Sequence, residues 1–333
     1  MKLRALHGSV VQSSLCTTLL DHGHLLFTNC YNPPTSSRGP SDKTEMIQYD
    51  AHKWSDHLLD IKGSMVREII GRVTLCVLWA LLVCLVNHAL RHDNDGPLGI
   101  PETAHGLIGG VLGLLLVFRT NASYDRFWEG RKLWGAMVND CRNAARMSRT
   151  WLAADAQLVR EITEWIAAYP WSVMHRLQGT KGLSPQSLDL DPADVAAVIA
   201  APHPPLAVAR HLSELFLKGK NTGLISDIQF VAIDANVQRL LDYLGGCERI
   251  QNTPMPFAYM VHLRRALIIY CFTLPFALID KYGFASLIIV LIISYTMFGI
   301  EEIGVEIENP FGSDENDLPL ERLCETISEN VRN

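Results

Sequence analysis

Two stretches of the 333-residue sequence concentrate side chains that can bind ions or anchor a helix at a membrane surface. In VFRTNASYDRFWEGRKLWG, residues 117–135, aromatic and charged side chains directly follow an uninterrupted apolar segment. The second stretch, residues 301–317, is acidic, and carboxylate oxygens are ligands that Ca²⁺ prefers. Its acidic residues are Glu301, Glu302, Glu306, Glu308, Asp314, Glu315 and Asp317.

No pattern typical of an enzyme site is present in the sequence. It has no Gly-rich phosphate loop, no HExxH motif and no nucleophile elbow. His88, His105 and His262 lie at the ends of apolar segments, but they offer no matched pair for haem ligation within one chain. The net charge of −6 gives no indication of nucleic-acid binding. We therefore expect a protein that is not an enzyme and carries no organic cofactor.

Four apolar segments surround the two stretches. Charged residues make up only 19% of the chain and the mean hydropathy is +0.12, which is high for a soluble protein. A helix needs about 20 apolar residues to cross a bilayer. We expect spans at about 69–90, 100–118, 261–279 and 283–300, with Pro275 accommodated by neighbouring helices. A buried helical hairpin of a soluble protein is the alternative for the last pair.

Basic residues beside these segments predict their orientation. They precede the first span, follow the second and open the third, whereas the two short loops offer only Arg91 and Lys281. Both termini and the region of about 119–256 are therefore expected in the cytoplasm. The basic residues concerned are Lys62, Arg67, Arg72, Arg119, Arg126, Arg131, Lys132, Arg264 and Arg265.

The sequence pattern of the cytoplasmic region is typical of helices, which predicts an all-α fold. SDIQ, residues 226–229, fits a capping box, and Asp191 caps a helix whose first turn contains Pro192. Gly245 and Gly246 are expected to end the helix that follows Ser226.

Residues 1–45 are expected to be a disordered extension that contains the loop-forming tract NPPTSSRGPSD. A signal peptide is the alternative, but Gln12, Asp21 and His22 interrupt the apolar block that it requires. Met46 is a possible start of the working protein. The eight cysteines show no metal-binding spacing and are expected to be reduced and structural.

Residues 109–151 contain no firm helix breaker, so one long helix is expected to leave the membrane near Arg119. Aromatic residues recur along it at three- and four-residue steps and are expected to share one face that packs against other helices. An interfacial aromatic belt with basic anchors is the alternative. The residues of this face are Tyr124, Phe127, Trp128, Arg131 and Trp134.

FRTNASYDRFWEGRKLWG, residues 118–135, resembles the bestrophin family of ion channels, and its bacterial branch closely. KGSMVRE before the first span and IENPFGSDENDLPLE after the fourth extend the resemblance to roughly residues 46–325. It implies a bestrophin-like channel domain over 46–333, in a bacterial inner membrane. The matching motif residues are Arg119, Asn121, Tyr124, Arg126, Trp128, Glu129, Arg131 and Trp134.

The resemblance implies a homopentamer in which the second span of each chain lines a central pore. Phe118, Leu114 and Gly110 match the positions of its narrow neck, and their spacing of four places them near one helical stripe. Apolar rings of this kind gate by dewetting. Gly110 departs from the bulky apolar residue often found there, while Gly109 and Gly113 favour close helix packing.

Three further assignments follow from the resemblance. Ile228 matches a second constriction at the cytoplasmic exit, although an ordinary core isoleucine is the alternative. Asp314 and Asp317 match calcium-binding carboxylates of eukaryotic members, with Asn309 and Glu306 at positions that supply backbone oxygens. A solvated acidic tail is the favoured interpretation, because Ser313 and Asn316 replace acidic residues.

The expected function is passage of monovalent ions, chloride or sodium, by a pentamer surrounded by membrane lipid. Apolar rings do not select by the sign of the charge, so the selectivity stays open. A secondary transporter is the alternative, but the cores of the four spans show neither inverted repeats nor ionisable groups.

Overall fold

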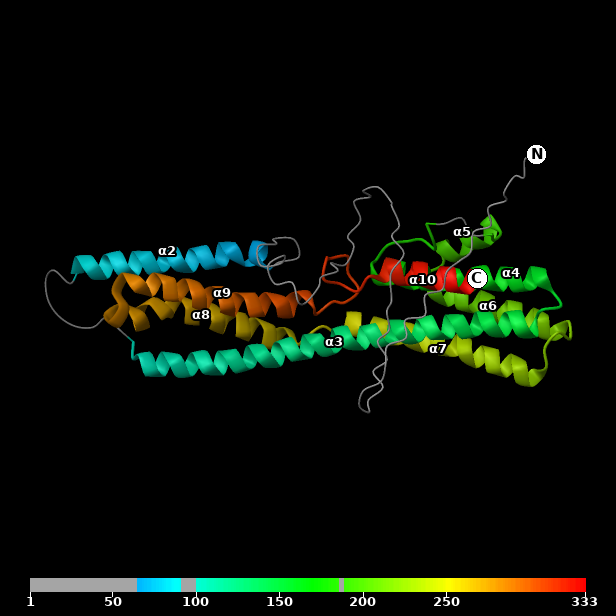
Figure 1. The fold of residues 1–333 in the computed structure, drawn as a ribbon, viewed down its shortest axis with the longest axis horizontal. Coiled ribbons are helices and arrows are strands. Elements are labelled where there is room, and N and C mark those ends of the chain that lie inside the picture. Colours follow the sequence, from blue (N-terminus) through cyan, green and yellow to red (C-terminus); the bar gives the residue numbers. More distant parts are fainter. Residues whose placement is uncertain (1–64, 91–99, 186–188) are drawn as a thin grey trace, which may run out of the picture. The chain divides into compact units, whose positions relative to one another are not determined.

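The computed structural model describes residues 65–90, 100–185 and 189–333, and within these ranges it is helical with no strand. The predicted all-α class is confirmed, whereas the expected extension over residues 1–45 lies outside the described residues. The helices are α2 (Val66–Leu90), α3 (Glu102–Trp151), α4 (Ala156–Leu177), α5 (Pro192–Ala200), α6 (Pro204–Asn221), α7 (Asp227–Asn252), α8 (Phe257–Tyr282), η1 (Gly283–Ala285), α9 (Ser286–Glu306) and α10 (Leu320–Arg332) (Figure 1).

One helical bundle combines α2, the first half of α3, α8 and α9 (Figure 1). In the described chain, three helical segments are long and apolar enough to cross a membrane: Val66–Ala89, Glu102–Trp151 and Phe257–Glu306. The third segment reverses at η1, where Gly283 has a φ of +52° that favours glycine. Its two arms, α8 and α9, pack against each other, and α8 runs through Pro275 without ending.

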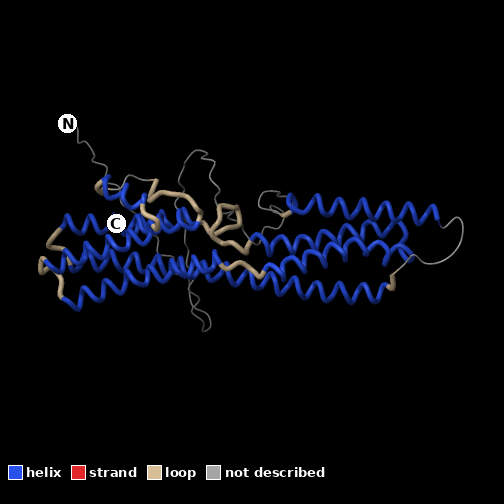
Figure 2. The backbone as a smooth tube through the Cα atoms, turned by 180° about the vertical axis from the view of Figure 1, so that it is seen from behind, coloured by secondary structure: helices blue, strands red, loops and turns tan. Residues whose placement is uncertain are grey.

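Helix α3 is continuous over 50 residues, about 75 Å at the usual rise (Figure 2). Its apolar first half belongs to the bundle, and its charged second half continues into a separate group of helices. The prediction of one uninterrupted helix through the aromatic stretch is therefore confirmed. Gly130 allows this helix to approach the chain after α9, because a Cβ there would lie 3.0 Å from the ring of Phe311.

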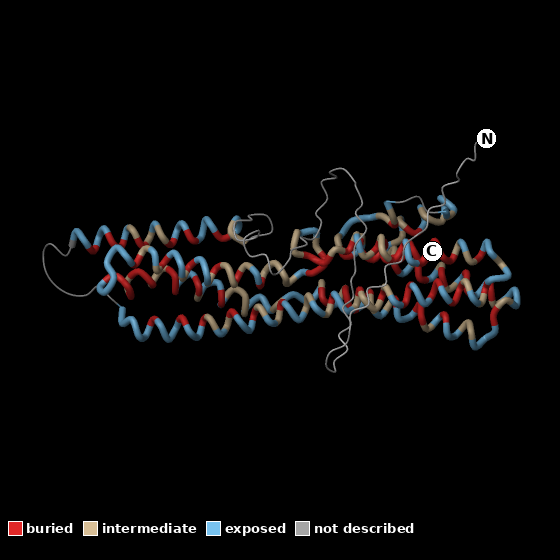
Figure 3. Tube along the Cα trace, viewed as in Figure 1, coloured by how far each residue is buried: buried red, intermediate tan, exposed pale blue. Residues whose placement is uncertain are grey.

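The second helical group contains the rest of α3 together with α4, α6, α7 and α10. Large apolar side chains such as Trp165 and Phe216 are fully buried in its core, and Figure 3 shows buried residues along the facing sides of these helices. The predicted capping box at Ser226 and the cap at Asp191 are both confirmed.

The predicted helix end at Gly245 and Gly246 is wrong, because α7 continues to Asn252. Gly246 is buried against α3, where an added Cβ would lie 2.8 Å from Leu133 Cδ1. This glycine therefore permits close packing of two helices.

Helices α3 and α7 run antiparallel. Glu129 of α3 pairs with Arg249 near the end of α7 at 2.6 Å, and Asp140 pairs with the earlier Arg239 at 2.9 Å. This register places the first turn of α7, which contains Ile228, level with the last turns of α3.

Candidate functional site

One side of α3 presents apolar side chains that no other described helix covers. Leu114 and Phe118 are 54% and 56% exposed, and Gly110 lies on the same exposed stripe. Leu112 and Leu116 on the opposite side are buried against the bundle. The structure therefore brings the three residues of the predicted neck to one free face of the helix.

The two glycines expected to serve helix packing differ. A Cβ at Gly109 would clash with the Tyr270 hydroxyl of α8, which confirms close packing there. Gly113 has nothing within 4 Å of an added Cβ, so the expectation is wrong within one chain. Tyr270 also stacks on His105, with ring centroids 4.3 Å apart.

The residue after Phe118 is the centre of a buried ion-pair cluster. Arg119 is 0% exposed, and its Nη1 lies 2.5 Å from Glu301 Oε1 of α9. Glu301 also accepts a hydrogen bond from Arg264 Nε of α8 at 2.8 Å, and Arg72 of α2 lies at 3.4 Å. Four helices therefore meet at one carboxylate.

This cluster holds α3 in the rotation that turns Phe118 outward. The sequence does not reveal the partner of Arg119. The expectation that Glu301 belongs to a solvated acidic tail is wrong, because Glu301 is 2% exposed. A signal was available: each residue is the first charged residue after an apolar segment.

Arg126 joins three parts of the chain. Its guanidinium donates to the carbonyl oxygens of Glu308 at 3.0 Å, Ile250 at 2.6 Å and Thr253. It therefore ties α3 to the end of α7 and to the segment after α9. Glu129 forms an ion pair with Arg249. The motif residues Arg126 and Glu129 therefore both have a structural role that accounts for their place in the motif.

The aromatic residues of α3 do not all pack on one face, and that prediction is wrong. Trp134 is fully buried and Phe127 packs against the same core, whereas Tyr124, Trp128 and Arg131 are exposed. At about 100° per residue these positions spread over a wide arc, so one edge meets the core and the other stays free. The motif residue Asn121 is also exposed.

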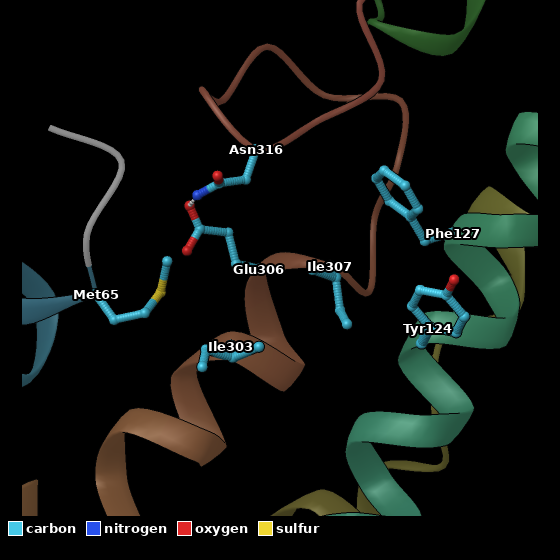
Figure 4. Close-up of a pocket in the computed structure, with 7 residues that line it drawn as sticks. All are labelled: Met65, Tyr124, Phe127, Ile303, Glu306, Ile307 and Asn316. Atoms are coloured by element: carbon cyan, nitrogen blue, oxygen red, sulfur yellow. Dashed lines mark hydrogen bonds between the residues drawn. The ribbon is translucent and has the colours of Figure 1, made fainter. Parts of the chain in front are cut away.

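A cavity of about 430 Å³ lies where Tyr124 and Phe127 of α3 face the end of α9 (Figure 4). Its lining is apolar apart from Glu306 and Asn316, which share a hydrogen bond of 2.9 Å. The other lining residues are Met65, Ile303 and Ile307.

The candidate calcium residues form a turn instead of an open set of ligands. Asp317 is buried, its Oδ2 accepts the Asp314 amide hydrogen at 2.8 Å, and burial raises the pKa of its carboxyl to about 6. Asp314 is exposed, and Asn309 accepts weakly from the Phe311 amide at 3.4 Å. Within the described residues no group of three His, Cys, Asp or Glu side chains is arranged to hold a metal.

These residues do not fit calcium within a single chain. The interpretation as a solvated tail is wrong for the buried Asp317, so neither expectation describes this turn fully. The calcium assignment stays a prediction.

Ile228 lies in the first turn of α7 and is 83% exposed. The alternative of an ordinary core isoleucine is therefore wrong. Its exposure leaves the predicted role at a second constriction open.

Comparisons of the sequence and of the structure with known proteins lead to the same family. A family model described as Bacterial/Fungal Bestrophin protein matches residues 46–333. Voltage-dependent anion channel-forming proteins of Nostoc and Synechocystis are 36% and 39% identical over 284 residues, which is 84% of this chain and 90% of each relative. A bacterial bestrophin homolog from Klebsiella pneumoniae has a TM-score of 0.72 at 31% identity, covering 79% of this chain and 97% of its own.

Proposed function

The chain belongs to the bacterial and fungal bestrophin family, and we propose that it forms a homopentameric channel for monovalent anions. The observation that carries the proposal is the exposed apolar stripe of Gly110, Leu114 and Phe118 on a helix whose opposite side packs against α8 and α9. In a membrane protein an apolar helix face of this kind is covered by lipid or by another subunit, or it lines a pore. Five copies around an axis place these residues in stacked rings.

The proposed channel crosses the membrane four times per chain, through α2, the first half of α3, α8 and α9. The reversal at η1 supports counting α8 and α9 as two crossings. Basic residues beside the apolar segments support a cytoplasmic location for both termini and for the region of about 119–256.

The proposed gate is the neck. Rings of Leu114 and Phe118 offer no polar group to replace the water around an ion, so conduction depends on whether the narrow pore stays wet. Small rotations of α3 change the neck radius, and the Arg119–Glu301 contact opposes such rotations. Ile228 forms a second constriction near the cytoplasmic exit.

The curated relatives named as anion channel-forming proteins support an anion as the permeant species. Among anions, chloride is the proposed ion, because a monovalent anion loses less hydration free energy in an apolar neck than a divalent one.

Purified protein in planar bilayers tests this function. We expect discrete single-channel current steps and a particle mass of five chains. Saturable ion uptake without unitary steps contradicts the channel and favours a transporter, and a monomeric particle contradicts the pore.

A further inference from the structure

The exposed stripe of α3 does not stop at the neck. An α-helix has 3.6 residues per turn, so positions 18 apart return to the same direction after about five turns. Lys132 therefore lies in the direction of Leu114, and Arg146 lies in the direction of Gly110. Below Phe118 the stripe becomes mostly polar, and its exposed members are Asn121, Asp125, Trp128, Lys132, Asn139, Asn143, Arg146 and Thr150.

The cations on this stripe differ from three arginines on the other faces of α3, whereas Arg131 and Arg142 on those faces are exposed as well. Arg119 and Arg126 are bound to carboxylates or carbonyls, and Arg149 donates to the Val331 and Arg332 carbonyls at 2.6 Å. By contrast, no hydrogen bond or ion pair with other described residues occupies the side chains of Lys132 and Arg146. These two cations are directed to solvent and remain available to mobile ions.

The antiparallel register places this polar stretch between the two proposed constrictions. Phe118 begins it, and Ile228 lies level with the last turns of α3, roughly 50 Å further along at 1.5 Å per residue. In a pentamer, five copies each of Lys132 and Arg146 would repel one another if they lay in an interface between subunits from which water is excluded. A water-filled passage that admits counter-ions removes this cost.

We propose that Lys132 and Arg146 line the passage between the neck and Ile228 and determine its selectivity for anions, with Asp125 acting against them. This inference rests on the proposed channel and identifies the residues that decide whether anions or cations pass through it. Positive rings raise the local concentration of chloride and lower that of sodium, whereas the Asp125 ring just below the neck has the opposite effect. The two cations outnumber the one carboxylate, so anions are favoured.

The test measures the chloride-to-sodium permeability ratio from reversal potentials in asymmetric NaCl. We expect Lys132→Gln combined with Arg146→Gln to lower the ratio by at least about threefold, and Asp125→Asn to raise it. Arg210→Gln is the matched control, because Arg210 is an exposed cation on α6, which does not contact α3. This control is expected to leave the ratio unchanged.

A chemical rescue separates selectivity from misfolding. Arg146→Cys should lower the ratio, and a methanethiosulfonate reagent carrying a positive charge should restore it on the same channels. The six described native cysteines are buried, and the unsubstituted protein treated with the reagent controls for Cys16 and Cys30.

Two failures are distinguishable. If the natural protein conducts but the double variant and the reagent leave the ratio unchanged, Lys132 and Arg146 do not face the passage and the inference is overturned. If the natural protein passes no current at all, the proposed channel itself fails.

Discussion

Arg119 and Glu301 form a buried ion pair between α3 and α9, with Nη1 and Oε1 2.5 Å apart. Charges removed from water in this way are stable only while both partners are present. The pair lies one residue after Phe118, so the rotation of the proposed pore helix depends on it.

Loss of the Glu301 charge is expected to destabilise the protein strongly. Among the described residues, Glu301→Gln leaves the buried Arg119 with only the Glu308 carboxylate, 4.0 Å from its Nη2, at a cost of about 3–5 kcal/mol in the free energy of unfolding. Thermal unfolding of the detergent-purified protein, followed by tryptophan fluorescence, measures the change. Arg72→Gln is the control: its half-exposed side chain should contribute less than about 1 kcal/mol. Equal effects of the two substitutions would contradict a special role for the buried pair.

Shortening the neck side chains should open the pore. Phe118→Ala and Leu114→Ala remove bulk from the proposed rings, so water and ions enter more readily and basal conductance in reconstituted bilayers should rise at least about tenfold. Ile108→Ala is a matched control, because Ile108 is exposed on another side of α3. Currents that change equally in all three variants, or in none, would count against the neck.

Acid should weaken the junction of α3 and α7 through Asp140, which lies in the charged half of α3. Burial alone would raise the pKa of Asp140, but hydrogen bonds from Arg239 at 2.9 Å and Tyr243 at 2.7 Å hold it below its usual range. A carboxyl with a lowered folded-state pKa stabilises the fold above its unfolded pKa of about 3.9, and this contribution is lost as the pH falls through the folded value.

The corresponding variant is Asp140→Asn, measured by thermal unfolding between pH 7 and pH 3. We expect a loss of about 2 kcal/mol at pH 7 and a weaker decline of stability with acid than in the natural protein. Parallel pH profiles of the two proteins would show that Asp140 does not contribute to the acid sensitivity.

Calcium removal is expected to leave the currents unchanged. Asp317 binds the amide of its own turn and Asp314 is exposed, and no three acidic side chains of the described residues are arranged to hold a metal, whereas calcium takes six to eight oxygen ligands. Open probability measured before and after addition of a chelator tests this. A fall in open probability that added calcium reverses would establish a site shared between chains.

Local patterns in the sequence were sufficient for much of the fold. The all-α class, the cap at Ser226 and the continuity of α3 depend on nearby residues and were confirmed. The helix end at Gly245 and Gly246 was predicted wrongly, because a glycine that allows Leu133 to pack closely looks the same in sequence as a glycine that ends a helix.

Contacts between distant segments were harder to predict. Glu301 lies 182 residues after Arg119, and its position as the first charged residue after an apolar segment does not by itself identify its partner. The same limit applies to the cations of α3, because only the structure shows that Arg126 and Arg149 are bound whereas Lys132 and Arg146 are not. Charge selectivity could therefore not be assigned from the sequence.

The reversal potential of the natural protein, reconstituted in a bilayer between unequal NaCl solutions, tests the central claim most directly. An anion-selective pore predicts discrete currents that reverse close to the chloride equilibrium potential. Reversal near the sodium equilibrium potential, or a bilayer that conducts no better with the protein than without it, would contradict the account.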